Sequence, residues 1–184
     1  MADSGLTEEV EWCGSRITTL KDLLRPALRA WIVGINPTVK SVGAGHYYQG
    51  RLGTRVWNFL ERSGALSAPA SGRFHDEEML SRHLGLTDLV KRPTASAAEL
   101  SPADFEFGIP KFLAKLGEFP PRLLAFPFKE AAERLVGPLP PRTWGATGAT
   151  VEGIPVFLLP IAYQPKAVME EARKAFRSEL DRTQ

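Results

Sequence analysis

Short apolar runs alternate with helical patterns along most of the chain. Each run is bounded on at least one side by Gly or Pro, which is typical of a buried strand rather than a helix. Because the runs are separated by helices, we predict an α/β fold: a three-layer α/β/α sandwich around a mostly parallel four-stranded sheet. The four predicted strands are Ala30–Val33, Leu86–Val90, Arg122–Phe126 and Ile154–Leu159.

Amphipathic patterns between the strands predict the helices. One follows the first strand and ends near Gly64, and another, Asp76–Leu84, carries acidic residues in its first turn, where the helix dipole favours them. Gly85 is expected to end that helix. Ser101 and Pro102 predict an N-cap followed by Pro at the first helical position. The remaining predictions are helices at Lys129–Val136 and from Lys166 to about Leu180, and an edge strand or extended loop at Thr143–Val151.

The amino-terminal part is more polar. Residues 1–16 predict a frayed end or short helix, with Trp12 packing back onto the body, and Ile17–Leu24 predicts a short helix that Pro26 ends. The small-residue segment 65–74 is too short to divide two domains. We therefore expect residues 1–184 to form a single domain, with 1–16 as a loosely ordered extension.

Most of the candidate chemistry lies in the Gly-rich loop after the first strand. The loop lacks the G-x-x-x-x-G-K-[ST] and G-x-G-x-x-G patterns of phosphate-binding loops. Its amide, hydroxyl, imidazole and phenol groups suit a flat heterocycle, whose faces stack on rings and whose edge forms hydrogen bonds. Strand, loop and helix together predict a ligand site at the carboxyl end of a parallel strand. The alternative is structural: Tyr47 and Tyr48 cover the sheet edge and Asn36 caps a turn.

Composition narrows the choice of function. The chain has 184 residues, is 43% hydrophobic and has a net charge of +2, and no apolar run approaches the ~18 residues of a membrane span. The start of the chain lacks a secretory pattern, so we expect a cytoplasmic protein. A single cysteine, Cys13, is too few for an internal disulfide, a Cys zinc site or an iron–sulfur cluster, and we expect no metal and no other cofactor. The mild basicity permits DNA binding, and cations in the predicted loops favour an anionic polymer.

Several short motifs resemble one known family. GINP at Gly34–Pro37, S-x-G-x-G at Ser41–Gly45, RVW at Arg55–Trp57 and SG at residues 63–64 resemble the first motif of the mismatch-specific uracil-DNA glycosylases, a group that includes the thymine-DNA glycosylases. LTDLVKRPTASAAELS at Leu86–Ser101 resembles the second conserved block of that family. The order and spacing of the blocks agree, and the resemblance covers roughly residues 29–180.

The resemblance implies a monofunctional glycosylase. Such an enzyme flips uracil or a mismatched base out of DNA and hydrolyses its N-glycosidic bond, leaving an abasic site for base excision repair; a monomer is usual at this size. Asn36 would position the attacking water, Tyr48 would stack on the flipped base, and Ser41 would lie in the base pocket. Backbone N–H groups near Ile35 and Tyr48 would read the pyrimidine edge, and His46 would contact the base or a phosphate.

Asp88 is a carboxylate inside an otherwise apolar strand, and its block places it close to the site. It could activate water or stabilise positive charge on the sugar; alternatively, it binds backbone donors or pairs with Lys91 or Arg92. An amide orients water but cannot deprotonate it, so reliance on Asn36 alone predicts a slow enzyme. The predicted phosphate contacts are Arg51, Arg55, Lys91 and Arg92, with a plain solvated turn as the alternative for the last two.

The sequence departs from the family pattern in three places. Thr38 replaces the last Gly of GINPG, Thr54 stands where Asn is common, and the loop after the last strand reads LPIAYQP where the family has LPNPSG. The DNA-inserting wedge would therefore be Ile161, Tyr163 or Gln164. These departures keep two other hypotheses open: a glycosylase-like module that binds DNA or a modified base without turnover, and an enzyme acting on a small nucleoside or nucleotide.

Overall fold

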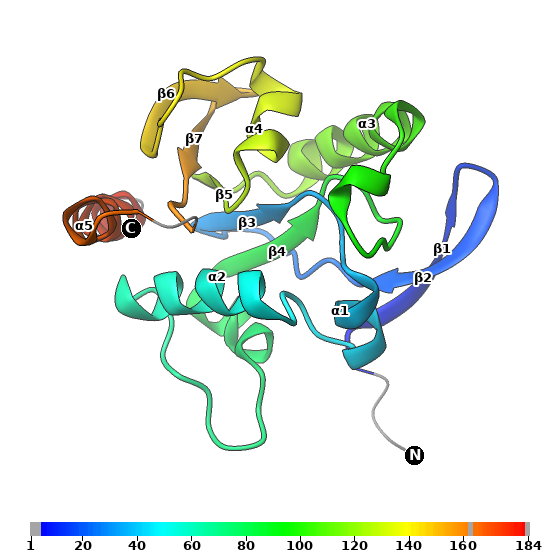
Figure 1. Cartoon of the computed structure of the whole chain (residues 1–184), viewed down its shortest axis with the longest axis horizontal. Helices are drawn as coiled ribbons and strands as arrows, with labels where there is room; N and C mark the ends of the chain where they lie inside the picture. The colour runs from blue at the N-terminus through cyan, green and yellow to red at the C-terminus, as the bar shows by residue number, and fades with distance from the viewer. Residues whose placement is uncertain (1–4, 162–163, 183–184) are drawn as a thin grey trace.

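A five-stranded sheet forms the centre of the computed structural model, which describes residues 5–161 and 164–182 (Figure 1). The strand order is β4-β3-β5-β7-β6, and neighbouring strands are parallel except for the antiparallel pair β6–β7. The predicted, mostly parallel sheet is confirmed, but it has five strands rather than four because the segment before the last strand pairs along the edge. The strands are β3 (Ala30–Gly34), β4 (Leu84–Asp88), β5 (Leu124–Phe126), β6 (Gly145–Val151) and β7 (Ile154–Leu158).

Helices cover both faces of the sheet, as the prediction of three layers requires. Successive side chains of β3 point to opposite faces, so Ile32 packs with Phe59 and Phe176 on one side, while Trp31 packs with Phe112 on the other. No helix among the described residues combines the length and the hydrophobicity that a membrane span needs. One face carries α2 (Arg51–Arg62) and α5 (Lys166–Arg182), and the other carries α3 (Pro102–Glu118) and α4 (Lys129–Val136) (Figure 1).

The amino-terminal segment is a β-hairpin, so the predictions of a frayed end or short helix before residue 17 and of a helix at Ile17–Leu24 are wrong. β1 (Thr7–Trp12) pairs with β2 (Ser15–Leu20) across the two-residue turn Cys13–Gly14. Both turn residues have positive φ, 47° and 79°, which matches the twist of a tight hairpin. Trp12 does pack back onto the body: it is 3% exposed, and its indole N–H donates to Asp104.

The predicted helix at Asp76–Leu84 is also wrong. Two short 3₁₀ turns, η1 (His75–Glu78) and η2 (Leu80–Arg82), occupy the segment, and His83 ends it with a φ of 56°. Gly85 lies inside β4 instead of ending a helix, at a place where a Cβ would come 2.8 Å from a methyl carbon of Leu28. Close packing of backbone against the core, rather than helix termination, therefore accounts for this glycine.

Candidate active site

The two sequence blocks run side by side beyond the ends of β3 and β4. Backbone hydrogen bonds join Leu89 N to Gly34 O at 3.1 Å and Val90 N to Ile35 O at 2.9 Å, and further along they join Thr94 N to the Pro37 carbonyl at 3.3 Å. β3 lies between β4 and β5, so the chain changes direction across the sheet at this point. Ligands of open α/β sheets bind at such a switch point, beyond the carboxyl ends of the strands.

The amide of Asn36 is held in one orientation. Its Nδ2 lies 2.9 Å from the carbonyl oxygen of Arg92, 2.7 Å from Thr94 Oγ1 and 3.2 Å from the Pro37 carbonyl oxygen. Because the nitrogen donates to these protein groups, Oδ1 remains as the acceptor for a ligand or a water molecule. Thr94, which is buried, was not among the predicted site residues; its position in the RPT turn of the second block was the available signal.

A cavity of about 280 Å³ lies next to this amide. Its wall includes five of the predicted site residues together with Phe128 and Leu20, which the sequence analysis missed. Phe128 follows β5 as Asn36 follows β3, so the common position after a parallel strand was a usable signal. Leu20 ends β2 and could not be found while that segment was predicted to be a helix. The predicted residues that meet here are Asn36, Ser41, Tyr48, Arg51 and Asp88.

A short helix, α1 (Val39–Ala44), shapes the loop that carries Tyr48. Thr38 caps this helix by accepting a hydrogen bond from the backbone N–H of Ser41 at 3.1 Å, and it donates to the Ser41 hydroxyl at 2.9 Å. The same hydroxyl oxygen accepts from Gln49 N at 3.0 Å. Thr38, one of the departures from the family pattern, thus has a capping role. Ser41 is buried, and its hydroxyl links Thr38 at the start of the loop to Gln49 near its end.

Tyr48 occupies a left-handed backbone conformation, with a φ of 54°. Its ring meets Trp57 edge-on, with centroids 5.5 Å apart. Gly53 of α2 packs against its backbone so closely that a Cβ there would lie 1.8 Å from the Tyr48 carbonyl oxygen. The ring is therefore positioned by backbone contacts as well as by the aromatic neighbour.

Asp88 ends β4 and is 2% exposed. Burial raises the pKa of its carboxyl to about 7; the charges of Lys91 and Lys115 oppose this rise, and the carboxylate of Asp22 adds to it. Among the described residues, neither Asp88 Oδ2 nor the phenol oxygen of Tyr48 has a hydrogen-bond partner. Burial, followed by the charge of Asp88, raises the pKa of the Tyr48 phenol well above its usual value, so this phenol is neutral.

Two of the predicted phosphate-binding cations are occupied by other protein groups. Lys91 is 8% exposed, and its ammonium group donates to the Leu20 carbonyl and lies 3.0 Å from Asp22 Oδ1. Arg92 forms two bonds to Asp104, of 2.8 and 2.7 Å. These cations therefore hold the hairpin and α3 against the sheet, and Lys91 is assigned no phosphate contact.

The other two cations belong to α2. Arg51 is exposed at the wall of the cavity, whereas Arg55 is half-buried, with its guanidinium 3.5 Å from the Ile161 carbonyl oxygen. Ile161, a predicted wedge residue, is 6% exposed and packs in the core, so no DNA contact is assigned to it. Tyr163 lies outside the described residues. Gln164 lines a separate hollow beside Trp144.

Two further predicted residues, His46 and Ile35, pack against other parts of the protein. His46 Nδ1 is 2.9 Å from Asp76 Oδ1, and its ring stacks on Phe74 with centroids 3.5 Å apart. The other oxygen of Asp76 accepts from Tyr47 N at 2.7 Å, so the pair ties the loop to η1. The Ile35 side chain is buried in the core. Neither His46 nor Ile35 is among the described residues that line the cavity.

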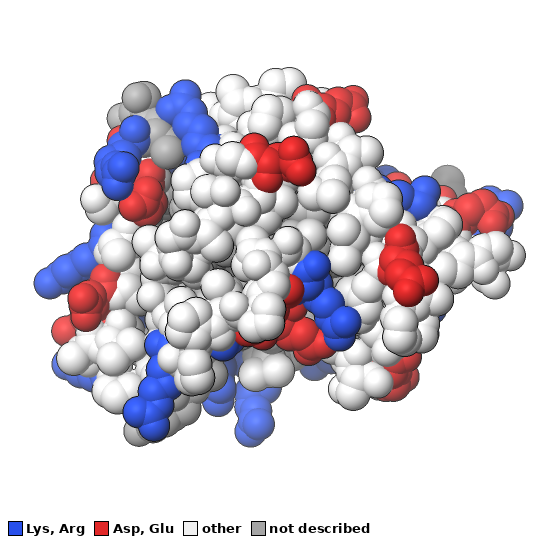
Figure 2. Space-filling view, turned by 90° about the horizontal axis from the view of Figure 1, so that it is seen from above, with Lys and Arg blue, Asp and Glu red and all other residues white. Residues whose placement is uncertain are grey.

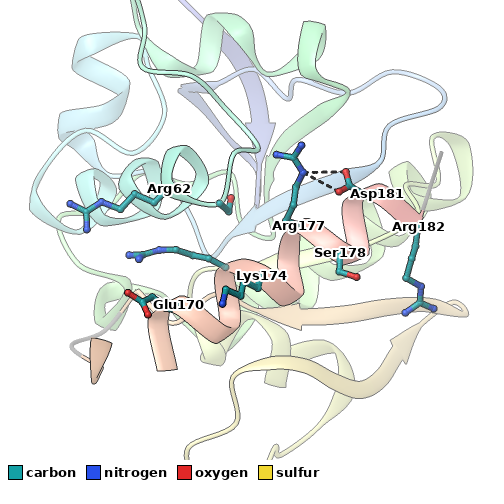
Figure 3. A pocket seen from close by; sticks show the side chains of 9 residues that line it. Arg62, Glu170, Lys174, Arg177, Ser178, Asp181 and Arg182 are labelled. Atoms are coloured by element: carbon teal, nitrogen blue, oxygen red, sulfur yellow. Dashed lines mark hydrogen bonds and ion pairs between the residues drawn. The ribbon is translucent and has the colours of Figure 1, made fainter. Parts of the chain in front are cut away.

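A second, larger hollow of about 760 Å³ lies between the carboxyl end of α2 and the length of α5 (Figure 3). In this view Arg177 turns toward Asp181, to which it is bonded, while Arg62 extends from α2. Within the described residues, Arg62, Arg173 and Lys174 take part in no ion pair, and the Nε of Arg173 is buried without a hydrogen-bond partner. On the face drawn in Figure 2, Lys and Arg are more numerous toward the side on which α5 lies. Five cations and two carboxylates, Glu170 and Asp181, line this groove, so it carries an excess of positive charge.

No group of three or more His, Cys, Asp or Glu side chains is placed to hold a metal ion in the part of the chain that the structure describes.

A comparison of the sequence with models of protein families identifies a known group. Residues 22–182 match the model of the Uracil DNA glycosylase superfamily, a range that contains both sequence blocks, the whole central sheet and every residue discussed at the cavity except Leu20. Because this match spans most of the chain, the protein belongs to the uracil-DNA glycosylase superfamily.

Proposed function

We propose that this protein is a monofunctional uracil-DNA glycosylase of the mismatch-specific type. Members of the superfamily are hydrolytic DNA N-glycosylases that act on damaged bases in DNA. The choice of uracil and of a mismatch-specific enzyme goes beyond this shared activity and is our proposal. The observation that carries it is the anchored amide of Asn36, whose oxygen is left as an acceptor beside a cavity lined by three aromatic residues, Tyr47, Tyr48 and Phe128.

The cavity supports recognition of a single extruded base. Tyr48 and Phe128 both line it and offer aromatic surfaces for stacking. Extrusion of a base from a duplex costs a few kcal/mol, and stacking on aromatic side chains is worth about 1–3 kcal/mol per base. Stacking alone therefore offsets much of the cost of flipping, and hydrogen bonds to the base edge supply selectivity.

Cleavage of the glycosidic bond leaves positive charge on the sugar and negative charge on the departing base. In the proposed reaction, Asn36 Oδ1 accepts a hydrogen bond from the attacking water and thereby fixes its direction. An amide takes no proton, so this step accelerates the reaction by positioning. Lys91 and Lys115, the lysines whose charges act on Asp88, line a separate hollow and are both paired with Asp22. We therefore assign the nucleophile to water and propose no lyase step.

The first prediction tests the reaction itself. Incubation with single- and double-stranded oligonucleotides that carry one uracil, followed by alkali, should cleave the labelled strand at the uracil position, because alkali breaks the backbone at an abasic site. Duplexes in which the uracil lies opposite G or opposite A are compared, and faster cleavage opposite G would show the proposed mismatch preference. Binding without cleavage in every uracil context, by a folded protein, would support the non-catalytic module instead. Release of uracil from free deoxyuridine would support the nucleoside enzyme.

The second prediction concerns the basic groove of α2 and α5. The pair of substitutions Arg62→Gln and Lys174→Gln should weaken binding to undamaged DNA and make it less dependent on salt, because each lost phosphate contact lowers the slope of log K against log[salt] by about 0.9. Fluorescence anisotropy across a salt series measures both effects. The matched control, Lys111→Gln with Arg122→Gln, removes two exposed cations at and beyond α3. Equal slopes for the two double variants would contradict a DNA contact in the groove.

A further inference from the structure

We propose that Asp88 acts as a neutral carboxylic acid, which donates a hydrogen bond to a carbonyl oxygen of the flipped base and stabilises negative charge on the base as the glycosidic bond breaks. This inference deepens the proposed function and rests on it. It differs from the role expected from the sequence, in which an ionised Asp88 activates water or faces the sugar. The two roles require opposite protonation states.

The position of Asp88 supports contact with the base. Asp88 lines the same cavity as Tyr48 and Phe128, the aromatic residues proposed to stack on the base. Gly34 leaves room for the carboxyl: a Cβ there would lie 2.0 Å from Asp88 Oδ1 and 3.3 Å from the Tyr48 phenol oxygen. Both polar groups thus lie over the same glycine. Buried polar atoms in proteins are nearly always paired, and Asp88 Oδ2 and the Tyr48 phenol oxygen lack a partner among the described residues. Because both residues line the cavity, we infer that a bound base supplies the missing partner.

The surrounding charges leave this carboxyl without a cation. Asp22, between β2 and β3, binds Lys91 at 3.0 Å and Lys115 of α3 at 2.7 Å. These two lysines and Asp22 are the charged groups that act on Asp88, and the phenols of Tyr47 and Tyr48 are its titratable neighbours. Because both ammonium groups bind Asp22, the burial of Asp88 outweighs their attraction and favours the neutral acid.

The chemistry of the step favours a donor at this position. The bond between C1′ and the base nitrogen breaks, and its electron pair stays on the base. Water adds to C1′ and releases a proton to solvent, and the base anion takes up a proton. A carboxylate beside that anion would repel it, whereas a carboxylic acid hydrogen bond strengthens as the charge develops. Asp88 retains its proton throughout. The arrangement suits bases with an oxo group that carries the developing charge, such as uracil and hypoxanthine.

The test compares the wild-type protein with Asp88→Asn and Asp88→Ala in single-turnover reactions on uracil-containing DNA between pH 5.5 and 9. The wild-type rate should be level below about pH 7 and fall about tenfold per pH unit well above it, because only the neutral acid donates. The Asn variant donates at every pH, so it should keep most of the wild-type rate at pH 5.5 and lose the alkaline decline. The Ala variant should be slower than the Asn variant at every pH. A wild-type rate that rises through pH 7, together with an inactive Asn variant, would overturn the proposal in favour of an ionised base.

Thermal unfolding gives a second readout that needs no activity. A carboxyl whose pKa is raised on folding contributes stability at low pH, and this contribution is lost as the pH rises toward the folded-state value of about 7. The Asn variant should therefore have a higher Tm than the wild-type protein at pH 8.5, with the difference shrinking toward pH 5.5. A Tm difference that does not change with pH would contradict a neutral Asp88. This result stands even if no uracil context is cleaved, which separates failure of the inference from failure of the proposed function.

Discussion

Replacing Asn36 by Ala should lower the single-turnover rate on uracil-containing DNA by about 100-fold or more, with little change in DNA affinity. The loss of one preorganised group at a reacting centre lowers the rate by about this factor. Without the amide, the water is no longer held in line with the bond that breaks. Rapid-quench measurement of strand cleavage after alkali gives the rate, and anisotropy with undamaged DNA gives the affinity.

Two companion variants make this result specific. Asn58→Ala removes an exposed Asn of α2 and should leave the rate unchanged. Thr94→Val keeps the shape of the side chain but removes the oxygen that lies 2.7 Å from Asn36 Nδ2, so the amide loses one of its anchors and the rate should fall about tenfold. Wild-type rates in Asn36→Ala would show that another group positions the water and would overturn the role assigned to the amide.

Replacing Gly53 by Ala should destabilise the protein by about 1–3 kcal/mol and abolish most of its activity. The new Cβ would lie 1.8 Å from the carbonyl oxygen and 2.3 Å from the carbonyl carbon of Tyr48. These are backbone atoms, which cannot rotate away as a side chain would, so either α2 or the loop must shift. A shift of the loop moves the ring of Tyr48, which lines the cavity.

The matched control for this variant is Gly117→Ala. Gly117 lies in α3 and is exposed, and outside its chain neighbours and the backbone of its own helix no heavy atom lies within 4 Å of the place where a Cβ would be built. Because Ala favours the helix by about 0.8–1 kcal/mol over Gly, this change should leave the protein at least as stable as the wild type. Thermal unfolding and uracil release measure both variants. The contact assigned to Gly53 would be disproved by equal Tm values for Gly53→Ala and the wild-type protein.

Much of the sheet and several site residues follow from local patterns. The predicted helix at Lys129–Val136 matches α4, and the Ser101-Pro102 signal marks the start of α3, where Asp104 completes a capping box. Asn36 and Asp88, distant in sequence, meet at one cavity because they follow or end adjacent parallel strands. The wrong predictions also concern local structure. Residues 7–20 form a hairpin instead of the predicted frayed end and helix because Cys13 and Gly14 adopt positive φ and form a tight turn, which the sequence pattern does not reveal for Cys13.

The sequence by itself determined the α/β class and the end of the sheet where the site lies, because strand periodicity and the order of strand, loop and helix are properties of neighbouring residues. The tertiary structure decided how each group there is used. Thr94 orients the amide of Asn36, Asp22 takes the charge of Lys91 and Lys115, and Asp88 is left buried without a cation. These outcomes depend on groups that are far apart along the chain and come within hydrogen-bonding distance only after folding, so no local pattern contains them.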